Sequence, residues 1–377
     1  MRKLEEILKY DQPTKFIVNS DDYNDEFEIP VLTAGKTFLL GFTSETEGVF
    51  DRIPAIIFDD FTTSFHYVDF PFKVKSSAMK ILTPKTDKVH LKYVFYQMQG
   101  LRIDTDLHKR YWISKFSKLQ IPQPPLKTQK LIAEILDNAG ALRDKTKQLL
   151  TEYDRLVQSI FLDMFGDTKK NPKLWKEDFL ENLCTDIIDC PHSTPNYVDE
   201  TTDYPCIRTT ELKKGEIDWS KMKYLDEEGY KLRTKRLVPK SGDIIYGREG
   251  TFGEAVLVPK NTLMSLGQRV ILFRPKHHKI NNLFLLHVIR SKGVYHQALR
   301  VNAGSTVGHV NVKDIKKFRI FIPPLPIQTQ FAEKINLIDR QKELAKKELR
   351  ESEDLFKALL QKAFKGELVK EKELEIN

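Results

Sequence analysis

The segment 247–253, Gly-Arg-Glu-Gly-Thr-Phe-Gly, is the stretch of this chain that most resembles a phosphate-binding loop. Its glycine spacing matches neither the dinucleotide-binding nor the nucleoside-triphosphate-binding motif, so nucleotide binding is not expected. The pattern instead predicts a tight strand–turn–strand from which Arg248, Glu249 and Thr251 project. Arginine commonly reads the guanine edge and glutamate can accept from cytosine, so these residues are candidate DNA contacts. The alternative is that Arg248 and Glu249 pair with each other on the surface.

A second polar segment, 189–195, is stiffened by two prolines and lies near three cysteines. The cysteine and histidine spacing does not match a usual zinc ribbon or finger, so we expect no metal site. Cys184 and Cys206 are expected to be small core residues. The alternative that we favour for this loop is that it faces DNA. Its candidate contacts are His192, Ser193 and Thr194.

In the first half, Asp59-Asp60 resembles a carboxylate pair for metal or acid–base chemistry. No histidine or Glu-x-Lys follows at catalytic spacing, so we expect Asp60 to cap a strand end or to orient Lys75 or an arginine. Lys73, Lys75 and Lys80 alternate along a strand-like stretch and are predicted to share one face. Phosphate contact and a solvated sheet face both fit that pattern. The candidate contacts in this part are Thr62, Thr63, His66, Lys73 and Lys75.

Two later loops combine charged, aromatic and small polar residues. The segment 108–112 places charge beside aromatic rings, and 304–311 takes the equivalent place in the second half. We expect both loops at the DNA edge, with Lys109 and Arg110 on phosphates. The other candidates in these loops are Tyr111, Ser305, Thr306 and His309.

Motifs of the enzymes that act on DNA are missing from the sequence. There is no Asn-Pro-Pro-Tyr-type methyltransferase motif, no Walker lysine and no nuclease carboxylate cluster. The Pro323-Pro324 pair follows Ile322 and serves the entry to a helix. The sequence therefore predicts a chain with no catalytic residues of its own.

The elements that must position these loops occur twice. A Pro-Pro-Leu stretch beginning at Pro124 recurs at Pro323, and the separation of 199 residues, the difference between those positions, also relates Phe165 to Phe364. That period is too long for a solenoid repeat and describes a globular segment followed by a long helix, twice. The expected divisions are a first globular domain at 1–123, a first spacer helix at 124–167, a second globular domain at 168–322 and a second spacer helix at 323–377.

Both helical stretches carry a heptad seam, with steps of three and four residues. The first runs from Leu126 to Phe165 and the second from about Ile327 to Phe364, each closed by a glycine. The basic seam residues Arg143 and Lys342 are 199 residues apart and either fix the register or turn outward. The seam positions are Leu136, Ala139, Arg143, Thr146, Leu150, Tyr153, Val157, Ile160 and Met164, and Ile335, Ile338, Lys342, Ala345, Leu349, Ser352, Phe356 and Leu359.

Helices of this length, about 60 Å at ~1.5 Å per residue, are expected to pack antiparallel and to hold two readers at a fixed gap. The globular halves share a layout but few residues, which predicts a bipartite, asymmetric target. Short helices are expected at 91–98 and 283–289. Strands are expected at 27–32, 53–58, 79–82, 116–122, 204–208, 243–246, 270–273 and 315–320.

The composition permits a nucleic-acid partner without requiring one. The 377 residues include 61 Lys and Arg against 53 Asp and Glu, a net charge of +8. A basic surface can release counterions from DNA, but ordinary solubility explains the excess equally well. The odd number of cysteines, the lack of an apolar run and the charged N-terminal segment favour a cytoplasmic protein without a membrane partner.

Over essentially its whole length, the chain resembles the DNA-specificity subunits of type I restriction–modification systems. The resemblance is carried by several short sequence segments and by their order around the two matched helices. The strings that carry the resemblance are 29–36, 58–63, 73–79, 206–212, 242–253 and 304–311, with the helix entries at Pro124 and Pro323. The first domain resembles the second only in outline, which leaves residue correspondence between the halves open. Further candidate DNA contacts in or beside the strings are Lys36, Thr37, Ser76, Arg208, Thr209 and Thr210.

The resemblance implies an α+β fold in which two target-recognition domains are separated by two long antiparallel helices, a coiled-coil spacer with pseudo-two-fold internal duplication. It implies a non-catalytic subunit that binds double-stranded DNA, two methyltransferase subunits and restriction or translocase subunits. S-adenosylmethionine, ATP and Mg²⁺ are then expected in those partners and no cofactor in this chain. Two other interpretations are a coiled-coil adaptor without base readout and a fused DNA methyltransferase.

Overall fold

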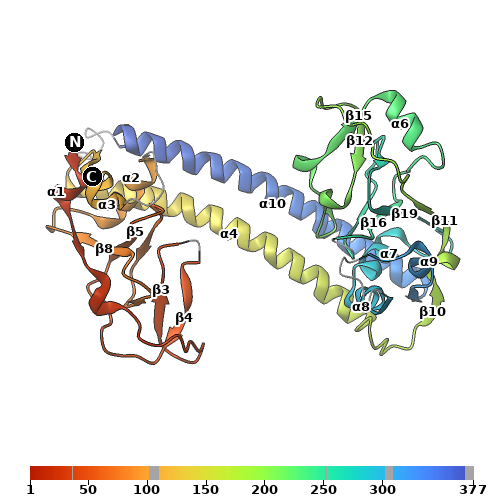
Figure 1. Cartoon of the computed structure of the whole chain (residues 1–377), viewed down its shortest axis with the longest axis horizontal. Helices are drawn as coiled ribbons and strands as arrows, with labels where there is room; N and C mark the ends of the chain where they lie inside the picture. Colours follow the sequence, from red (N-terminus) through yellow and green to blue (C-terminus); the bar gives the residue numbers. More distant parts are fainter. Residues whose placement is uncertain (36, 102–109, 251–252, 302–308, 370–377) are drawn as a thin grey trace. The chain divides into compact units, whose positions relative to one another are not determined.

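The computed structural model describes residues 1–35, 37–101, 110–250, 253–301 and 309–369. The chain divides into two compact units, one of residues 1–149 together with the chain from Ala345 on, the other Leu150–Leu344. Each unit holds one sheet-containing domain and part of both long helices (Figure 1). Among the described residues, no helix combines the length and apolarity needed to cross a bilayer.

The two long helices confirm the helical prediction. Helix α4 covers Leu126–Phe165 and α10 covers Leu325–Lys365, both without interruption (Figure 1, yellow and blue). Each is followed by a glycine in the left-handed region, with φ of 83° at Gly166 and 75° at Gly366. A glycine adopts this conformation without strain and ends a helix there.

The predicted seam is the contact between the helices in each unit. In the first unit, Leu136 and Thr146 of α4 and Ser352 and Phe356 of α10 are buried. The guanidinium of Arg143 lies 4.9 Å from the centre of the Phe356 ring, so this basic seam residue packs on an aromatic face. Early residues of α4 thus meet late residues of α10, which is an antiparallel arrangement.

In the second unit the late part of α4 meets the early part of α10. Phe161 and Phe165 pack against Phe331, with ring centres 5.6 and 5.2 Å apart. The seam residue Lys342 binds Asp154 of α4 at 2.8 Å and Glu216 at 3.2 Å. The direction is again antiparallel, and the prediction of an α+β chain with two long packed helices is confirmed.

The described residues of the first domain form three small sheets. The four-stranded sheet has the order β2 (Leu8–Asp11), β8 (Met79–Pro84), β5 (Ala55–Asp59), β6 (Phe65–Val68), and the three-stranded sheet has the order β4 (Leu39–Thr43), β3 (Ile29–Leu32), β7 (Lys73–Val74). Strand β1 (Arg2–Lys3) pairs with β9 (Gln120–Ile121). The helices are α1 (Leu4–Ile7), α2 (Leu91–Gly100) and α3 (Tyr111–Ser114), with 3-10 turns at Pro13–Phe16 and Phe116–Lys118.

The second domain repeats these sheets. The four-stranded sheet is β11 (Cys184–Asp189), β19 (Val270–Pro275), β16 (Ile244–Gly247), β17 (Ala255–Leu257), and the three-stranded sheet is β15 (Lys223–Leu225), β12 (Tyr204–Ile207), β18 (Ser265–Leu266). Strand β10 (Lys176–Phe179) pairs with β20 (Arg319–Ile322), and β13 (Leu212–Lys213) pairs with β14 (Glu216–Ile217). The helices are α5 (Leu180–Leu183), α6 (Glu227–Arg233), α7 (Asn282–Ile289), α8 (Lys292–Val301) and α9 (Val312–Lys316), with 3-10 turns at Thr209–Glu211 and Trp219–Lys221.

Strand order and direction agree between the two domains, so the duplication extends to topology. In each four-stranded sheet all pairs are antiparallel. In each three-stranded sheet one pair is antiparallel and one parallel. Phe58 of β5 lies opposite Lys80, and Tyr246 of β16 lies opposite Ile271, which aligns the two domains residue by residue at this edge.

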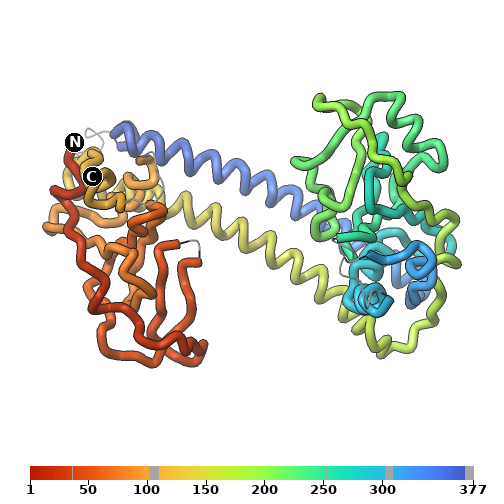
Figure 2. Tube along the Cα trace, viewed as in Figure 1, coloured from red at the N-terminus to blue at the C-terminus, as the bar shows by residue number. Residues whose placement is uncertain are grey.

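Alternate residues of the central strands enter two different core layers, as the period of two in a strand requires. In β5, Ile56 and Phe58 pack toward the helices, whereas Ile57 packs toward the three-stranded sheet. In β16, Tyr246 and Ile245 divide in the same way. Figure 2 shows the blue end of α10 beside the red and orange first domain, where Ala363 joins the helix-facing core.

A glutamine near the start of each long helix joins that helix to the start of a shorter one. The side-chain carbonyl of Gln129 accepts from the backbone N–H of His90 at 2.9 Å, and its amide donates to Pro124 O at 2.8 Å. Gln328 makes the equivalent bonds, 2.8 Å from Asn281 N and 2.7 Å to Pro323 O. Both are buried, so each satisfies backbone groups that the Pro-Pro entry and a helix start leave without partners.

Two expected strands are largely helical turns instead. Residues 116–118 form a 3-10 turn and only Gln120–Ile121 pair, while Val312–Lys316 is helix α9 and the strand begins at Arg319. The buried Ile315 and Phe318 are three residues apart, a spacing that suits a helical turn better than a strand. The strands β9 and β20 begin only at the residues that pair with β1 and β10, respectively.

Candidate nucleic-acid interface

The strand–turn–strand predicted at 247–253 is present. Strand β16 ends at Gly247, and the chain returns antiparallel into β17 at Ala255. Gly250 and Gly253 have φ of 69° and 95°, which a side chain would strain. Thr251 lies outside the described residues.

Arg248 does not project from this turn as predicted. Its side chain is 9% exposed, and its Nε lies 2.9 Å from Asp189 Oδ1 at the end of β11. A second nitrogen, Nη1, lies 3.6 Å from Glu249 Oε1 and 3.3 Å from His309 Nε2. A guanidinium withdrawn from water needs a carboxylate partner, and the neighbouring strand supplies one. Arg248 thus pairs with Glu249, but inside the domain and at a longer distance than its contact with Asp189.

Glu249 connects three basic groups at this edge. Its Oε1 lies 2.8 Å from His309 Nδ1, and its Oε2 lies 3.3 Å from Arg269 Nε. Arg269 was not predicted, because it stands just before a buried strand and belongs to no motif. Its backbone is left-handed, with φ of 63°, and its side chain is 64% exposed.

The loop 189–195 lies at the same edge. The side chain of His192 is 79% exposed, with Nε2 3.8 Å from Asp189. Thr194 Oγ1 accepts from the Gln268 amide at 3.1 Å, which joins this loop to the segment before β19. Ser193 is bound through its backbone carbonyl by Arg233 at 2.7 Å.

Arg233, at the end of α6, holds these two loops together from inside. It is 6% exposed and donates to Leu266 O at 3.0 and 2.7 Å and to Gly267 O at 2.5 Å. It also donates to carbonyls of the 189–195 loop. One buried guanidinium can satisfy several carbonyls at once because its donors form a rigid planar fork. No sequence motif marks this residue.

Cys184 and Cys206 are buried, which confirms their prediction as core residues. Burial raises the pKa of the Cys184 thiol to about 12, so it stays protonated at neutral pH. Within the described ranges, no group of three or more His, Cys, Asp or Glu side chains is arranged to hold a metal ion.

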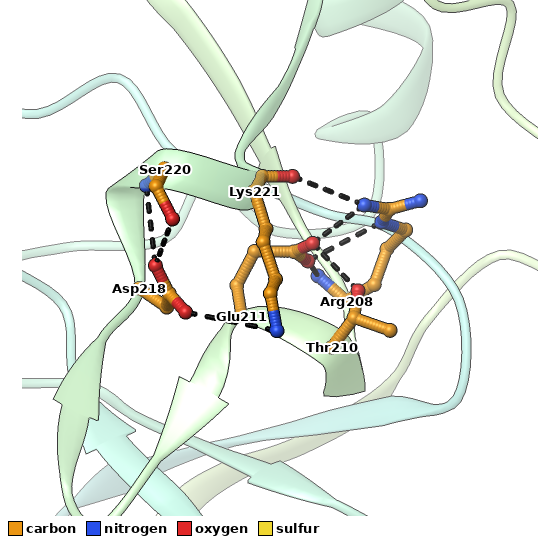
Figure 3. A network of polar contacts seen from close by, with 6 residues as sticks. All are labelled: Arg208, Thr210, Glu211, Asp218, Ser220 and Lys221. Atoms are coloured by element: carbon orange, nitrogen blue, oxygen red, sulfur yellow. Dashed lines mark hydrogen bonds and ion pairs between the residues drawn. The ribbon is translucent and has the colours of Figure 1, made fainter. Parts of the chain in front are cut away.

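Arg208 and Thr210 belong to a second polar network, centred on Glu211 (Figure 3). The fully buried carboxylate of Glu211 accepts from Arg208 Nη2 at 2.5 Å, from the Arg208 backbone at 2.6 Å and from Thr210 Oγ1 at 2.6 Å. Hydrogen bonding to Glu211 raises the pKa of the Arg208 guanidinium. Thr209 is buried. This network fixes the chain between β12 and β13.

In the first domain, the loop after β5 is shaped by Asp59. Its carboxylate accepts from the backbone of Phe61 and Thr62 at 2.8 and 2.9 Å, and Thr63 is left-handed with φ of 59°. His66 lies against Gly35 O at 3.0 Å and the Phe38 ring at 4.7 Å. The structure thus brings His66 to the 33–38 loop that contains the exposed Thr37, while Lys36 lies outside the described residues.

The prediction that three lysines share one face is wrong. Lys73 is the first residue of β7, and its side chain is 2% exposed and binds Glu45 at 2.9 Å. Lys75 binds Asp21. Lys80 belongs to β8 in the other sheet and pairs with Asp60 at 3.6 Å, so Asp60 orients Lys80 and not Lys75. The chain leaves one sheet after Val74 and enters another at Met79, which breaks the alternation.

The segment before α3 separates into buried and exposed parts. Tyr111 is 1% exposed and its N–H donates to Asp60 O at 2.9 Å, whereas Arg110 and Ser76 are exposed. Lys109, Ser305 and Thr306 lie outside the described residues. The structure therefore places Ser76, Thr62 and Arg110 in segments beside the end of β5. In the second domain it gathers Arg248, Glu249 and His309 at the end of β16.

Comparisons with known proteins agree with this architecture. The family described as "Type I restriction modification DNA specificity domain" matches residues 1–152 and 196–353. The Escherichia coli type I restriction enzyme EcoR124I/EcoR124II specificity subunit is 32% identical over 357 residues, covering 89% of this chain and 85% of that protein.

Solved structures share the fold. The S subunit of a type I restriction–modification system from M. genitalium superposes with a TM-score of 0.60 at 15% identity, covering 96% of this chain and 95% of that one. A chain from a study of complex assembly and conformational transition in a type I system gives 0.55 at 15% identity, with 97% of each chain covered. At this identity the likeness establishes the fold alone.

Proposed function

This chain belongs to the family of type I restriction–modification DNA specificity subunits, and we propose that its two target-recognition domains each read one half of a split, asymmetric DNA site. The family is non-catalytic and directs the restriction–modification complex to DNA. In this proposal the domains span 1–123 and 168–322, and the long helices α4 and α10 separate them.

One observation carries the proposal: the two domains have the same strand order but different chemistry at the equivalent edge. The residue directly after β5 is Asp60, and the equivalent residue after β16 is Arg248. Before β8 the chain has Ser76, and at the equivalent position before β19 it has Gly267. Two domains with the same strand order but different side chains at the equivalent edge fit two different half-sites, because base edges are distinguished by their patterns of donors and acceptors.

Exposure divides the candidate contacts into two roles. We propose that exposed side chains meet DNA directly, whereas Lys73, Tyr111, Thr209 and Arg248 hold the reading edge in place from the interior. Phosphate contacts then supply affinity and salt dependence, and base contacts supply sequence choice. The exposed candidates among the described residues are Thr37, Thr62, Ser76, Arg110, His192, Ser193, Thr194 and Thr210.

The outer faces of the helices offer docking surfaces for partner subunits. Leu142, Leu149 and Leu156 are seven residues apart on α4 and 43%, 41% and 44% exposed, so they form a stripe separate from the buried seam. On α10, Leu337 and Leu344 are likewise exposed. We propose that two methyltransferase subunits, and through them restriction subunits, bind these faces. S-adenosylmethionine, ATP and Mg²⁺ then belong to those partners.

The proposal is tested by exchanging residues 168–322 for the corresponding domain of another specificity subunit. The complex is expressed in a restriction-deficient host, and methylated positions are mapped across the genome. One half of the methylated site should change while the other half stays the same. A change in both halves would contradict the assignment of one domain to one half-site.

A further inference from the structure

We propose that Arg269, in the segment just before β19, reads a G·C pair in the half-site of the second domain. The inference rests on the proposed function and adds a specificity-determining residue to it. Arginine presents two parallel donors that fit the O6 and N7 acceptors of guanine in the major groove.

The backbone holds Arg269 in one place. Its left-handed φ of 63° is unusual for a residue with a side chain, and such conformations persist only where the surroundings hold them. Its carbonyl accepts from Arg248 N at 3.0 Å, and Gly267 N donates to Ile207 O at 2.7 Å. Arg233 binds the carbonyls of Leu266 and Gly267 from inside. The segment is therefore prearranged, which reduces the entropy lost on binding.

The side chain is oriented but still accessible. Nε lies 3.3 Å from Glu249 Oε2, and the side chain remains 64% exposed, so further guanidinium donors can meet a base. Glu249 is itself fixed by His309 at 2.8 Å. A carboxylate beside an arginine disfavours a phosphate through like charge but can accept from cytosine N4. The pair thus matches the donors and acceptors of a G·C pair better than it matches the DNA backbone.

The first domain has no arginine at the position equivalent to Arg269. Asp60 N donates to Ala78 O at 3.0 Å, as Arg248 N donates to Arg269 O at 3.0 Å, so Ala78 occupies the position of Arg269. A methyl group cannot donate to guanine. The effect of changing Arg269 should therefore be confined to one half-site, and the other half-site becomes an internal reference.

The test uses the full chain assembled with its methyltransferase partners and a library of sites randomised in both halves. Arg269→Ala should lower the preference for one base at one position of one half-site by roughly 10- to 100-fold. Arg269→Lys, which keeps the charge and loses the fork, should give most of the same loss. Arg319→Ala is the matched control, because Arg319 is 69% exposed and, like Arg269, forms an ion pair with a glutamate, here Glu177.

Retained preference in the other half-site and an unchanged unfolding midpoint show that the variants fold. A uniform loss of methylation across all sequences, restored by Arg269→Lys, would assign Arg269 to a phosphate and overturn the inference. An unchanged base profile would overturn it as well. The wild-type profile tests the proposed function separately, because a single undivided site would contradict the split target whatever Arg269 does.

Discussion

Asp60 and Arg248 occupy the same position in the repeated fold and carry opposite charges. Each N–H donates to the residue before the neighbouring strand at 3.0 Å, and each C=O accepts from a later loop at 2.9 Å. Asp60 pairs with the buried Lys80, whereas Arg248 pairs with Asp189. The duplicated frame thus keeps an ion pair at the equivalent sheet edge of each domain, while the charges of its two partners are exchanged.

Asp60→Asn should destabilise the first domain by about 3–5 kcal/mol, because it leaves Lys80 buried without a countercharge. Denaturant unfolding of the full chain measures this. Asp354→Asn, which removes an acid that is 80% exposed, should change the free energy of unfolding by less than about 0.5 kcal/mol. A combined Asp60→Asn and Lys80→Met variant should recover part of the loss. Equal losses for Asp60 and Asp354 would contradict a structural role for the buried pair.

Gln129→Leu and Gln328→Leu should each cost about 1–3 kcal/mol, since each leaves a helix-start N–H and a prolyl carbonyl without a partner. The free energy of unfolding from urea titration is the measurement. Gln341→Leu, on an exposed position of α10, is the control. A loss in only one of the two variants would show that the repeated glutamines do not share a role.

The elements that were predictable from sequence are those whose pattern is local or repeated. The helix ends at Gly166 and Gly366 follow from a heptad pattern and a glycine at its end. The role of Gln129 was not predicted, but its recurrence 199 residues later at Gln328 already marked both positions.

The candidate DNA contacts were less predictable, because the burial and the ion pairing of their side chains depend on segments that are distant in the sequence. Arg248 was expected to project, yet Asp189, which withdraws it, is 59 residues earlier in the chain, the difference between their numbers. Lys73 and Lys80 were expected on one face, yet they belong to different sheets. Arg269 was missed because its left-handed backbone depends on neighbours that no local pattern identifies.

His287→Leu should weaken the loss of stability in acid. His287 packs against the rings of Phe161 and Phe331, and burial lowers its pKa to about 3. Below about pH 6.5, His287 therefore binds a proton in the unfolded chain but not in the folded chain. The free energy of unfolding is at its full value above that pH, and it falls toward pH 3 by up to ~1.4 kcal/mol per pH unit. Unfolding measured from pH 7 to 4 should show a shallower decline in the variant. His192→Gln, at an exposed histidine, should keep the wild-type slope.

Leu149→Glu should weaken binding of methyltransferase subunits by roughly 10-fold or more, because it places a charge in the exposed apolar stripe. Titration of the subunits followed by sedimentation measures the affinity. The variant should fold normally, since this side chain is outside the seam. Gln148→Glu, also exposed on α4 but turned about 100° away from Leu149 around the helix, is the control for added charge. Undiminished assembly by Leu149→Glu would exclude the stripe as the docking face.

Lengthening both long helices by seven residues should widen the gap between the half-sites. A heptad inserted after Lys147 in α4 and at the paired position in α10, near Glu353, keeps the seam in register. Seven residues add about 10 Å of helix, which corresponds to about three base pairs of duplex. Genome-wide mapping of methylated sites should show both half-sites unchanged with more bases between them. A control insertion in the turn at Asn261 should leave the gap as it is. An unaltered gap in the helix variant would mean that spacing is set by the domains or their partners, because two added turns cannot be absorbed by an uninterrupted seam.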